Sequence, residues 1–173
     1  AYKIAKERKI KEIDTQDLVK IIETSKIKKN YKIHSATKVF QALRIFVNKE
    51  ISELIYGLIN ATKVLDEGGI IAVVSFHSLE DKIIKYFFKT YSEKNKNPSR
   101  YFPKLDKEDI RLFDCPIKKS INPSEKEILI NRPSRSAKLR YGIRNNKKYF
   151  FPNELIKQFK NYLEIERMGV DLW

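Results

Sequence analysis

The sequence predicts an α/β fold, and two observations support that prediction. An uninterrupted apolar run, Ile70–Val74, follows the glycine pair at 68 and 69 and is typical of a buried parallel strand. The run ends in a polar cluster at residues 75–78, and an amphipathic helical pattern begins directly behind it. Strand, short turn and helix form one half of a βαβ unit. Ligands bind at the carboxyl ends of such strands, so Ser75, His77 and Ser78, which the strand delivers to that edge, are candidate site residues.

Composition restricts the class of protein. The 173 residues are 42% apolar and 34% charged, enough for one domain, or for a domain and part of another. No apolar run approaches the roughly 18 to 20 residues that span a bilayer, and the N-terminus lacks a signal-peptide pattern. A single cysteine, Cys115, excludes an internal disulfide, and the absence of HExxH and CxxC spacings argues against a metal enzyme. Together these features favour the cytoplasm.

The net charge of +14 points to a polyanionic partner, because lysine and arginine that neutralise phosphates release counterions. An alternative is genomic bias, since an AT-rich coding sequence enriches Lys, Ile, Asn, Tyr and Phe everywhere. We favour RNA because arginines also cluster locally. The stretch 131–140 contains Arg132, Arg135, Lys138 and Arg140, and its guanidinium groups and serine hydroxyls suit phosphate oxygens.

Helices precede the strand. Residues 1 to about 33 predict two helices, the second capped by Asp14 or Thr15, followed by a basic connection at 26–32. One long helix is expected from Thr37 to Asp66, with Ser35 or Thr37 as N-cap and the glycine pair as terminator. Apolar residues recur along it at intervals of three and four, which places them on one stripe.

The elements after the strand are shorter. A helix is expected over residues 79–91 with Ile83, Ile84, Phe87 and Phe88 inward, then a polar loop over 92–107 and a short strand over 110–113. Ser124 can cap a brief helix that carries glutamates in its first turn. Residues 137–143 predict a final strand. The tail after residue 152 predicts one amphipathic helix that ends near residue 169.

His77 is the sharpest single candidate for chemistry. At the carboxyl end of a strand it could accept a proton or orient a substrate. Equally, it could be a structural histidine that hydrogen-bonds the backbone of the turn. Glu80 and Asp81 most simply stabilise the N-terminus of the following helix through its dipole.

Four segments together resemble the bacterial ribosomal RNA small subunit methyltransferase H family, also called MraW. They are residues 34–48 (HSATKVFQALRIFVN), 69–81 (GIIAVVSFHSLED), 115–128, and 131–140 (NRPSRSAKLR). Their order along the chain makes the resemblance specific, and it covers about residues 1–144. The sequence departs from the family pattern at Ser35, Lys38 and Val39, and Arg132-Pro133 replaces Pro-Arg.

The resemblance implies an S-adenosylmethionine-dependent enzyme that methylates N4 of a cytidine in the decoding region of small-subunit (16S) rRNA. It implies the second half of a Rossmann-like class I methyltransferase sheet, whose last strand is antiparallel, together with the end of a helical insert. Residues 1–35 would end that insert, 36–145 would form the C-terminal half of the methyltransferase domain, and 146–173 a helical tail.

The resemblance also implies where the cofactor would bind. The family's glycine-rich loop and ribose-binding acidic residue are expected upstream of this chain, so no cofactor-binding residue is assigned here and the chain alone is expected to be inactive. His77 is the catalytic candidate, with Ser75 and Phe76 toward the target base. Arg44, Arg135, Lys138 and Arg140 are the candidates for contacts with rRNA or the 30S subunit. The alternative is a non-enzymatic RNA-binding module or truncated paralogue. Neither a metal nor a membrane is expected.

Overall fold

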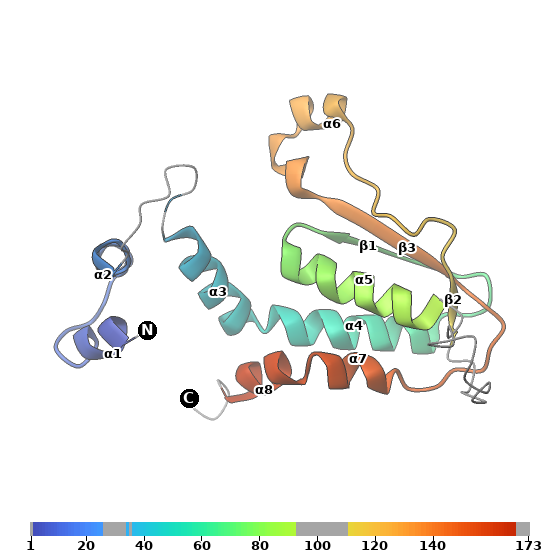
Figure 1. The fold of residues 1–173 in the computed structure, drawn as a ribbon, viewed down its shortest axis with the longest axis horizontal. Coiled ribbons are helices and arrows are strands. Elements are labelled where there is room, and N and C mark those ends of the chain that lie inside the picture. Colours follow the sequence, from blue (N-terminus) through green and yellow to red (C-terminus); the bar gives the residue numbers. More distant parts are fainter. Residues whose placement is uncertain (1, 26–33, 35, 93–110, 169–173) are drawn as a thin grey trace, which may run out of the picture. The chain divides into compact units, whose positions relative to one another are not determined.

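A computed structural model describes residues 2–25, 34, 36–92 and 111–168. The chain divides into two compact units, one formed by Ala1–Glu50 with Met168–Trp173 and the other by Ile51–Arg167. Within the described ranges, no helix is both long and apolar enough to cross a membrane. Helices and strands are mixed (Figure 1), so the expected α/β class is confirmed at that level.

The first unit contains α1 (Tyr2–Glu7), α2 (Thr15–Ser25) and α3 (Thr37–Asn48). The two predicted N-terminal helices are therefore present. Asp14 caps α2, because its carboxylate accepts the backbone N–H of Asp17 at 2.7 Å. The basic connection at 26–32 and the N-cap candidate Ser35 lie outside the described residues.

The single long helix expected from Thr37 to Asp66 is wrong. It is interrupted at Lys49, whose φ of 52° is left-handed, and α4 (Glu50–Val64) begins at the next residue. The N–H of Lys49 hydrogen-bonds to the carbonyl oxygens of Ile45 and Phe46, which ends α3 in the manner of a C-cap. Ala36 occupies the N-cap position of α3 without a side-chain bond. Apolar periodicity runs through the break, so it did not reveal the interruption.

The second unit contains a three-stranded sheet of order β1-β3-β2. Strand β1 (Ile70–Ser75) pairs antiparallel with β3 (Lys138–Arg144), from Ile70 opposite Ile143 to Ser75 opposite Lys138. Strand β2 (Phe113–Asp114) pairs antiparallel with the far edge of β3. The last strand is antiparallel as expected, whereas the parallel pairing predicted for β1 is not found among the described residues.

Burial of β1 also differs from the prediction. An uninterrupted apolar run predicted a strand covered on both faces, but burial alternates along it. Ile71 and Ser75 are buried, while Ile70 is 59% and Val74 52% exposed. Helix α5 packs on one face of the sheet only, and no described element covers the other (Figure 1).

Helix α5 (Ser78–Ser92) provides much of the core of the second unit, as the apolar pattern predicted. Ile83, Ile84, Phe87 and Phe88 are all buried. Phe113 of β2 packs on Phe87 and Phe88, with ring centroids 5.5 and 5.8 Å away. Buried aromatic side chains contribute large apolar areas and favour such tilted and edge-to-face pairs. The core therefore fixes α5 against β2 and β3.

A glycine turn precedes β1, and a serine-capped helix precedes β3 in the chain. Gly68 has a φ of +80°, donates its N–H to the carbonyl of Arg144, and so leads the chain from α4 into β1. Before β3 in the chain, the predicted Ser124 cap is present, with its hydroxyl accepting the N–H of Glu127 at 3.2 Å. It opens α6 (Glu125–Ile130), which is followed by the short 3-10 helix η1 (Arg132–Ser136).

The tail forms two helices rather than the predicted one, α7 (Asn153–Gln158) and α8 (Lys160–Met168). The break falls at Phe159, whose ring is buried and packs edge-on against Tyr86 of α5 at 5.5 Å. Tyr91 of α5 accepts the N–H of Leu155 through its hydroxyl at 3.3 Å. The tail is thus part of the core of the second unit.

Candidate functional site

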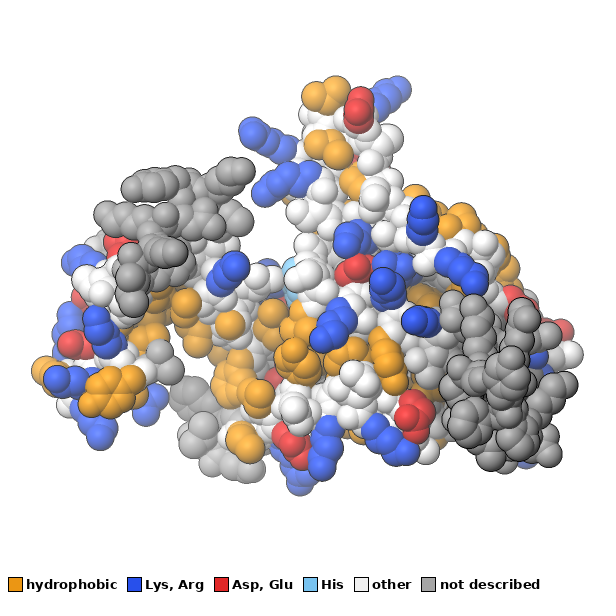
Figure 2. Space-filling model, in the orientation of Figure 1, with side chains coloured by type: hydrophobic (Ala, Val, Ile, Leu, Met, Phe, Trp, Pro, Cys, Tyr) orange, Lys and Arg blue, Asp and Glu red, His pale blue; other side chains and the backbone are white. Residues whose placement is uncertain are grey.

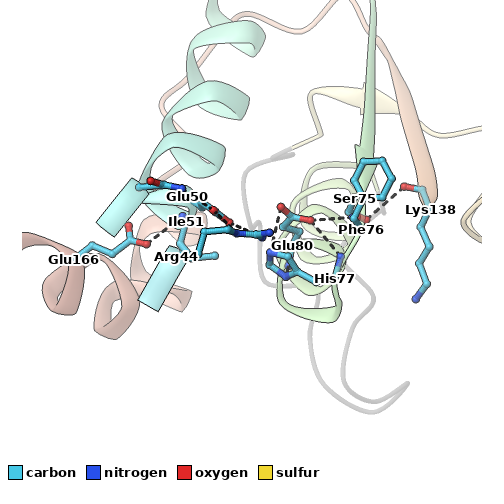
Figure 3. A network of polar contacts seen from close by, with 10 residues as sticks. Arg44, Glu50, Ile51, Ser75, Phe76, His77, Glu80, Lys138 and Glu166 are labelled. Carbon is cyan, nitrogen blue, oxygen red and sulfur yellow. Dashed lines mark hydrogen bonds and ion pairs between the residues drawn. The ribbon is translucent and has the colours of Figure 1, made fainter. Parts of the chain in front are cut away.

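His77 and Glu80 form a reciprocal cap at the junction of β1 and α5 (Figure 3). The Nδ1 atom of His77 accepts the backbone N–H of Glu80 at 3.3 Å. The Glu80 carboxylate reaches back and accepts the N–H groups of Phe76 at 2.9 Å and His77 at 3.3 Å. This is the arrangement of a capping box, with histidine in the place of serine or threonine.

The cap selects the tautomer of the neutral imidazole. Because Nδ1 accepts a hydrogen bond, the proton of neutral His77 is on Nε2, which lies 3.2 Å from Oε1 of Glu80. The side chain is only 10% exposed. The structure therefore shows the structural contact that the sequence left open as an alternative for His77. Its catalytic role stays a prediction.

The two neighbouring candidates differ in exposure. Ser75 is buried, and its hydroxyl donates to the carbonyl of Lys138 on β3 at 3.4 Å. Phe76 is 57% exposed at the strand end. Of the two, only the Phe76 ring presents a surface on which a base could stack.

Asp81 forms ion pairs with two of the basic candidates. Its carboxylate binds Arg140 Nε at 2.8 Å and Lys138 Nζ at 3.0 Å, because alternate residues of β3 face α5. Burial by itself raises the pKa of Asp81, but the hydrogen bonds from Arg140 and Lys138 outweigh it and hold the pKa below its ordinary value. Arg140 is only 12% exposed, whereas Lys138 is 42% exposed. Arg140 is thus committed to an internal ion pair.

The remaining basic candidates are exposed. Arg44 forms a two-point ion pair with Glu50 at 2.8 and 3.1 Å within the first unit, and it keeps 57% of its side chain exposed. Arg135 and Arg132 are exposed on η1. Arg44 belongs to the first unit, whereas Lys138 and Arg140 belong to the second, and each remains a separate candidate for phosphate.

Sequence reasoning missed three carboxylates that organise the second unit: Glu80, Asp81 and Glu166. Glu80 and Asp81 were interpreted mainly through the helix dipole, with a catalytic carboxylate as the less favoured alternative. The H-x-x-E spacing at a helix start could have indicated the capping box. The K-x-R spacing on a strand could have placed both cations on one face. No local signal could have found Glu166, whose partners lie more than a hundred residues away.

The sequence profile described as the MraW methylase family matches residues 1–144. This chain belongs to the MraW methylase family. A relative from Bartonella bacilliformis, named ribosomal RNA small subunit methyltransferase H, is 45% identical over 83% of this chain and 44% of its own length. A relative of the same name from Methylorubrum extorquens is 47% identical over 66% of this chain and 32% of its own length.

The MraW family assignment confirms the resemblance drawn from the four segments. A further relative of the same name, from Rhizobium rhizogenes, is 46% identical over 78% of this chain and 39% of its own length. The chain thus spans less than half the length of the curated relatives that it matches. Most of this chain corresponds to the C-terminal portion suggested by the segments, and its strand end, cap and ion-paired basic residues belong to a methyltransferase family.

Proposed function

We propose that this chain is part of an S-adenosylmethionine-dependent enzyme that methylates N4 of a cytidine in small-subunit rRNA. The observation that carries the proposal is the family match over residues 1–144, together with relatives named for small-subunit rRNA methylation. The net charge of +14 supports a polyanionic substrate. Its site of action is proposed to be cytoplasmic, on rRNA or the 30S subunit.

The cofactor is proposed to bind mainly through residues outside this chain. S-adenosylmethionine, when bound, supplies an electrophilic methyl group on a sulfonium. The carboxylates at the β1 end already have partners within the chain: Glu80 accepts the amides of Phe76 and His77, and Asp81 pairs with Lys138 and Arg140. No residue of this chain is therefore proposed to hold the cofactor.

The contribution of this chain is to position the target base. Cytosine must leave its stack before a protein can reach its exocyclic amine, and stacking on an aromatic ring holds such a base. The exposed Phe76 ring is proposed as that platform. The cap formed by His77 and Glu80 fixes the backbone of Phe76, because the Phe76 N–H is held by the Glu80 carboxylate at 2.9 Å. His77 is proposed to act next to the amine as a positioning group, because its Nδ1 already accepts the Glu80 N–H.

Methyl transfer tests the proposal. The complete reading frame that includes this chain is incubated with labelled S-adenosylmethionine and unmodified small subunits, and this chain is assayed beside it. We expect label in rRNA only with the complete protein, and N4-methylcytidine after nuclease digestion and mass spectrometry. Small subunits already carrying the modification are the control and should take up no label. Label on another atom or base would overturn the N4 assignment, and no label at all would overturn the activity.

A further inference from the structure

A cleft in the second unit lies apart from the strand end. It has a volume of about 230 Å³ and runs between the C-terminal half of α5, the middle of β3 and the segment after β2. Figure 2 shows Lys and Arg side chains gathered over α5 and β3 on the face drawn. Four of the lining residues are basic and none is acidic: Lys85, Lys89, Lys118 and Arg140.

Among the described residues, no carboxylate pairs with the two lysines that α5 contributes to this cleft. Lys85 and Lys89 are exposed and lie four residues apart on α5, so their like charges repel each other and destabilise the helix slightly. In the ranges that the structure describes, neither lysine forms an ion pair. A bound anion would relieve this repulsion.

Arg140 lines the cleft and is held in place by two contacts. Its Nε binds Asp81 at 2.8 Å, and its Nη1 donates to the backbone carbonyl of Lys118 at 3.3 Å. The arginine therefore ties the segment after β2 to β3 and α5, and its own charge is used in doing so. Lys85 and Lys89 therefore define the electrostatic character of the opening.

We propose that this cleft binds the phosphodiester backbone of an RNA strand, through Lys85 and Lys89. The inference rests on the proposed RNA substrate and adds a contact site to it. Its volume lies below the roughly 300 to 1,000 Å³ of pockets that enclose small-molecule ligands. A run of phosphates needs only a positively charged groove along its backbone. The four motif segments contain neither lysine, so the site was not among the candidates from the sequence.

Salt dependence of RNA binding tests the proposal. The probe is a short single-stranded RNA of mixed sequence, titrated with this chain between about 50 and 200 mM salt. Each single-strand phosphate contact contributes about 0.7 to the magnitude of the slope of log K against log salt. Removing both charges, as Lys85→Gln with Lys89→Gln, should therefore reduce the magnitude of that slope by about 1.4 and weaken the affinity for RNA by about 25-fold at 0.1 M salt. Lys63→Gln, an exposed lysine on α4 outside the cleft, is the matched control and should leave both nearly unchanged.

The only cysteine of the chain gives a second readout, since Cys115 lines the same cleft. RNA should slow its alkylation by a thiol reagent at least 5-fold in the unmodified chain and not in the double variant. Equal binding by the double variant and Lys63→Gln would overturn the cleft assignment and leave the RNA substrate standing. If pyrophosphate or a polyglutamate peptide protected Cys115 from alkylation as well as RNA does, the cleft would instead be a small-anion or acidic-peptide site, and the proposal would be overturned. Absence of RNA binding by the unmodified chain would overturn it too, while methylation by the complete protein remains a separate question.

Discussion

The carboxylate of Glu166, in the last described helix, accepts the backbone N–H of Ser52 at the start of α4 at 2.8 Å (Figure 3 shows its bond to the neighbouring Ile51). It also accepts the Ser52 hydroxyl at 2.5 Å and the N–H of Ile51 at 3.1 Å. These amides belong to the first turn of α4, where helix N–H groups lack partners within the helix. A residue of the tail thus caps a helix 114 positions earlier in the chain.

Replacing this cap should destabilise the second unit. Glu166 is 4% exposed, and hydrogen bonds to a charged group contribute about 1.5 to 3 kcal/mol each. Glu166→Gln places an amide N–H₂ against donors, so we expect the free energy of unfolding to fall by about 2 to 3 kcal/mol in urea denaturation followed by circular dichroism. Glu164→Gln is the control, because Glu164 is half-exposed and its ion pair is with Lys160 on the same helix. An equal fall in the free energy of unfolding of both variants would show that the cap does not stabilise the second unit.

The ion pairs of Asp81 predict a dependence on pH. The pKa of Asp81 in the folded chain is below its ordinary value of 3.8, so its stabilising contribution is complete above about pH 4 and is lost as pH falls through the folded pKa. Asp81→Asn should lower the free energy of unfolding by about 2 kcal/mol at pH 7, since it removes charged acceptors for Lys138 and Arg140. The difference from the unmodified chain should shrink below pH 4. The exposed Asp66→Asn should show no such difference, and a gap that persists at pH 3 would contradict the account.

Two variants of His77 separate capping from chemistry. Asparagine is a good N-cap and alanine is not, so His77→Asn should retain stability within about 0.5 kcal/mol while His77→Ala loses about 1 kcal/mol. In the complete protein, a catalytic imidazole requires both variants to lose methyl transfer. If His77→Asn keeps both stability and methyl transfer while His77→Ala loses both, His77 acts through positioning alone. Activity retained by both would remove it from the catalytic candidates.

Replacing each of two glycines by alanine should change the free energy of unfolding in opposite directions. A Cβ on Gly142 of β3 would lie 2.7 Å from Cε1 of buried Phe88, so Gly142→Ala should destabilise the chain by about 1 to 3 kcal/mol through overpacking. Gly57, inside α4, has nothing within 4 Å of the same position, and Gly57→Ala should stabilise by up to about 1 kcal/mol. Thermal unfolding of the two variants beside the unmodified chain measures both effects. A stable Gly142→Ala variant would mean that Phe88 moves away easily.

Patterns that depend on local spacing predicted the structure well. The inward face of α5, the Ser124 cap and the extent of β3 follow from periods of 3.6 and 2 and from capping chemistry. Contacts between distant residues did not follow from the sequence. The break at Lys49 and the break at Phe159 occur inside continuous apolar stripes, and the partners of Asp81 lie more than fifty positions away. The motif segments identified the family, but they could not show that Arg140 is held by an internal carboxylate.

The uncovered face and edge of β1 predict self-association of this chain. Ile70 and Val74 are more than half exposed on the face away from α5, and β1 lies at the edge of the described sheet. An edge strand with exposed apolar residues pairs readily with another chain. We expect sedimentation velocity to show oligomers that increase with concentration, and Val74→Lys to reduce them severalfold. Val64→Lys is the matched control, because Val64 is 77% exposed but lies on α4.

The same experiment bears on the proposal that further strands complete this sheet in the full protein. If those strands normally cover β1, the complete protein should be monomeric under conditions in which this chain associates, because the edge and the Val74 face are then occupied. Val74→Lys should in turn destabilise the complete protein, since it would bury an unpaired charge. A chain of these 173 residues that stays monomeric at high concentration and unfolds cooperatively would contradict the half-sheet interpretation, because its sheet would then be complete without additional strands.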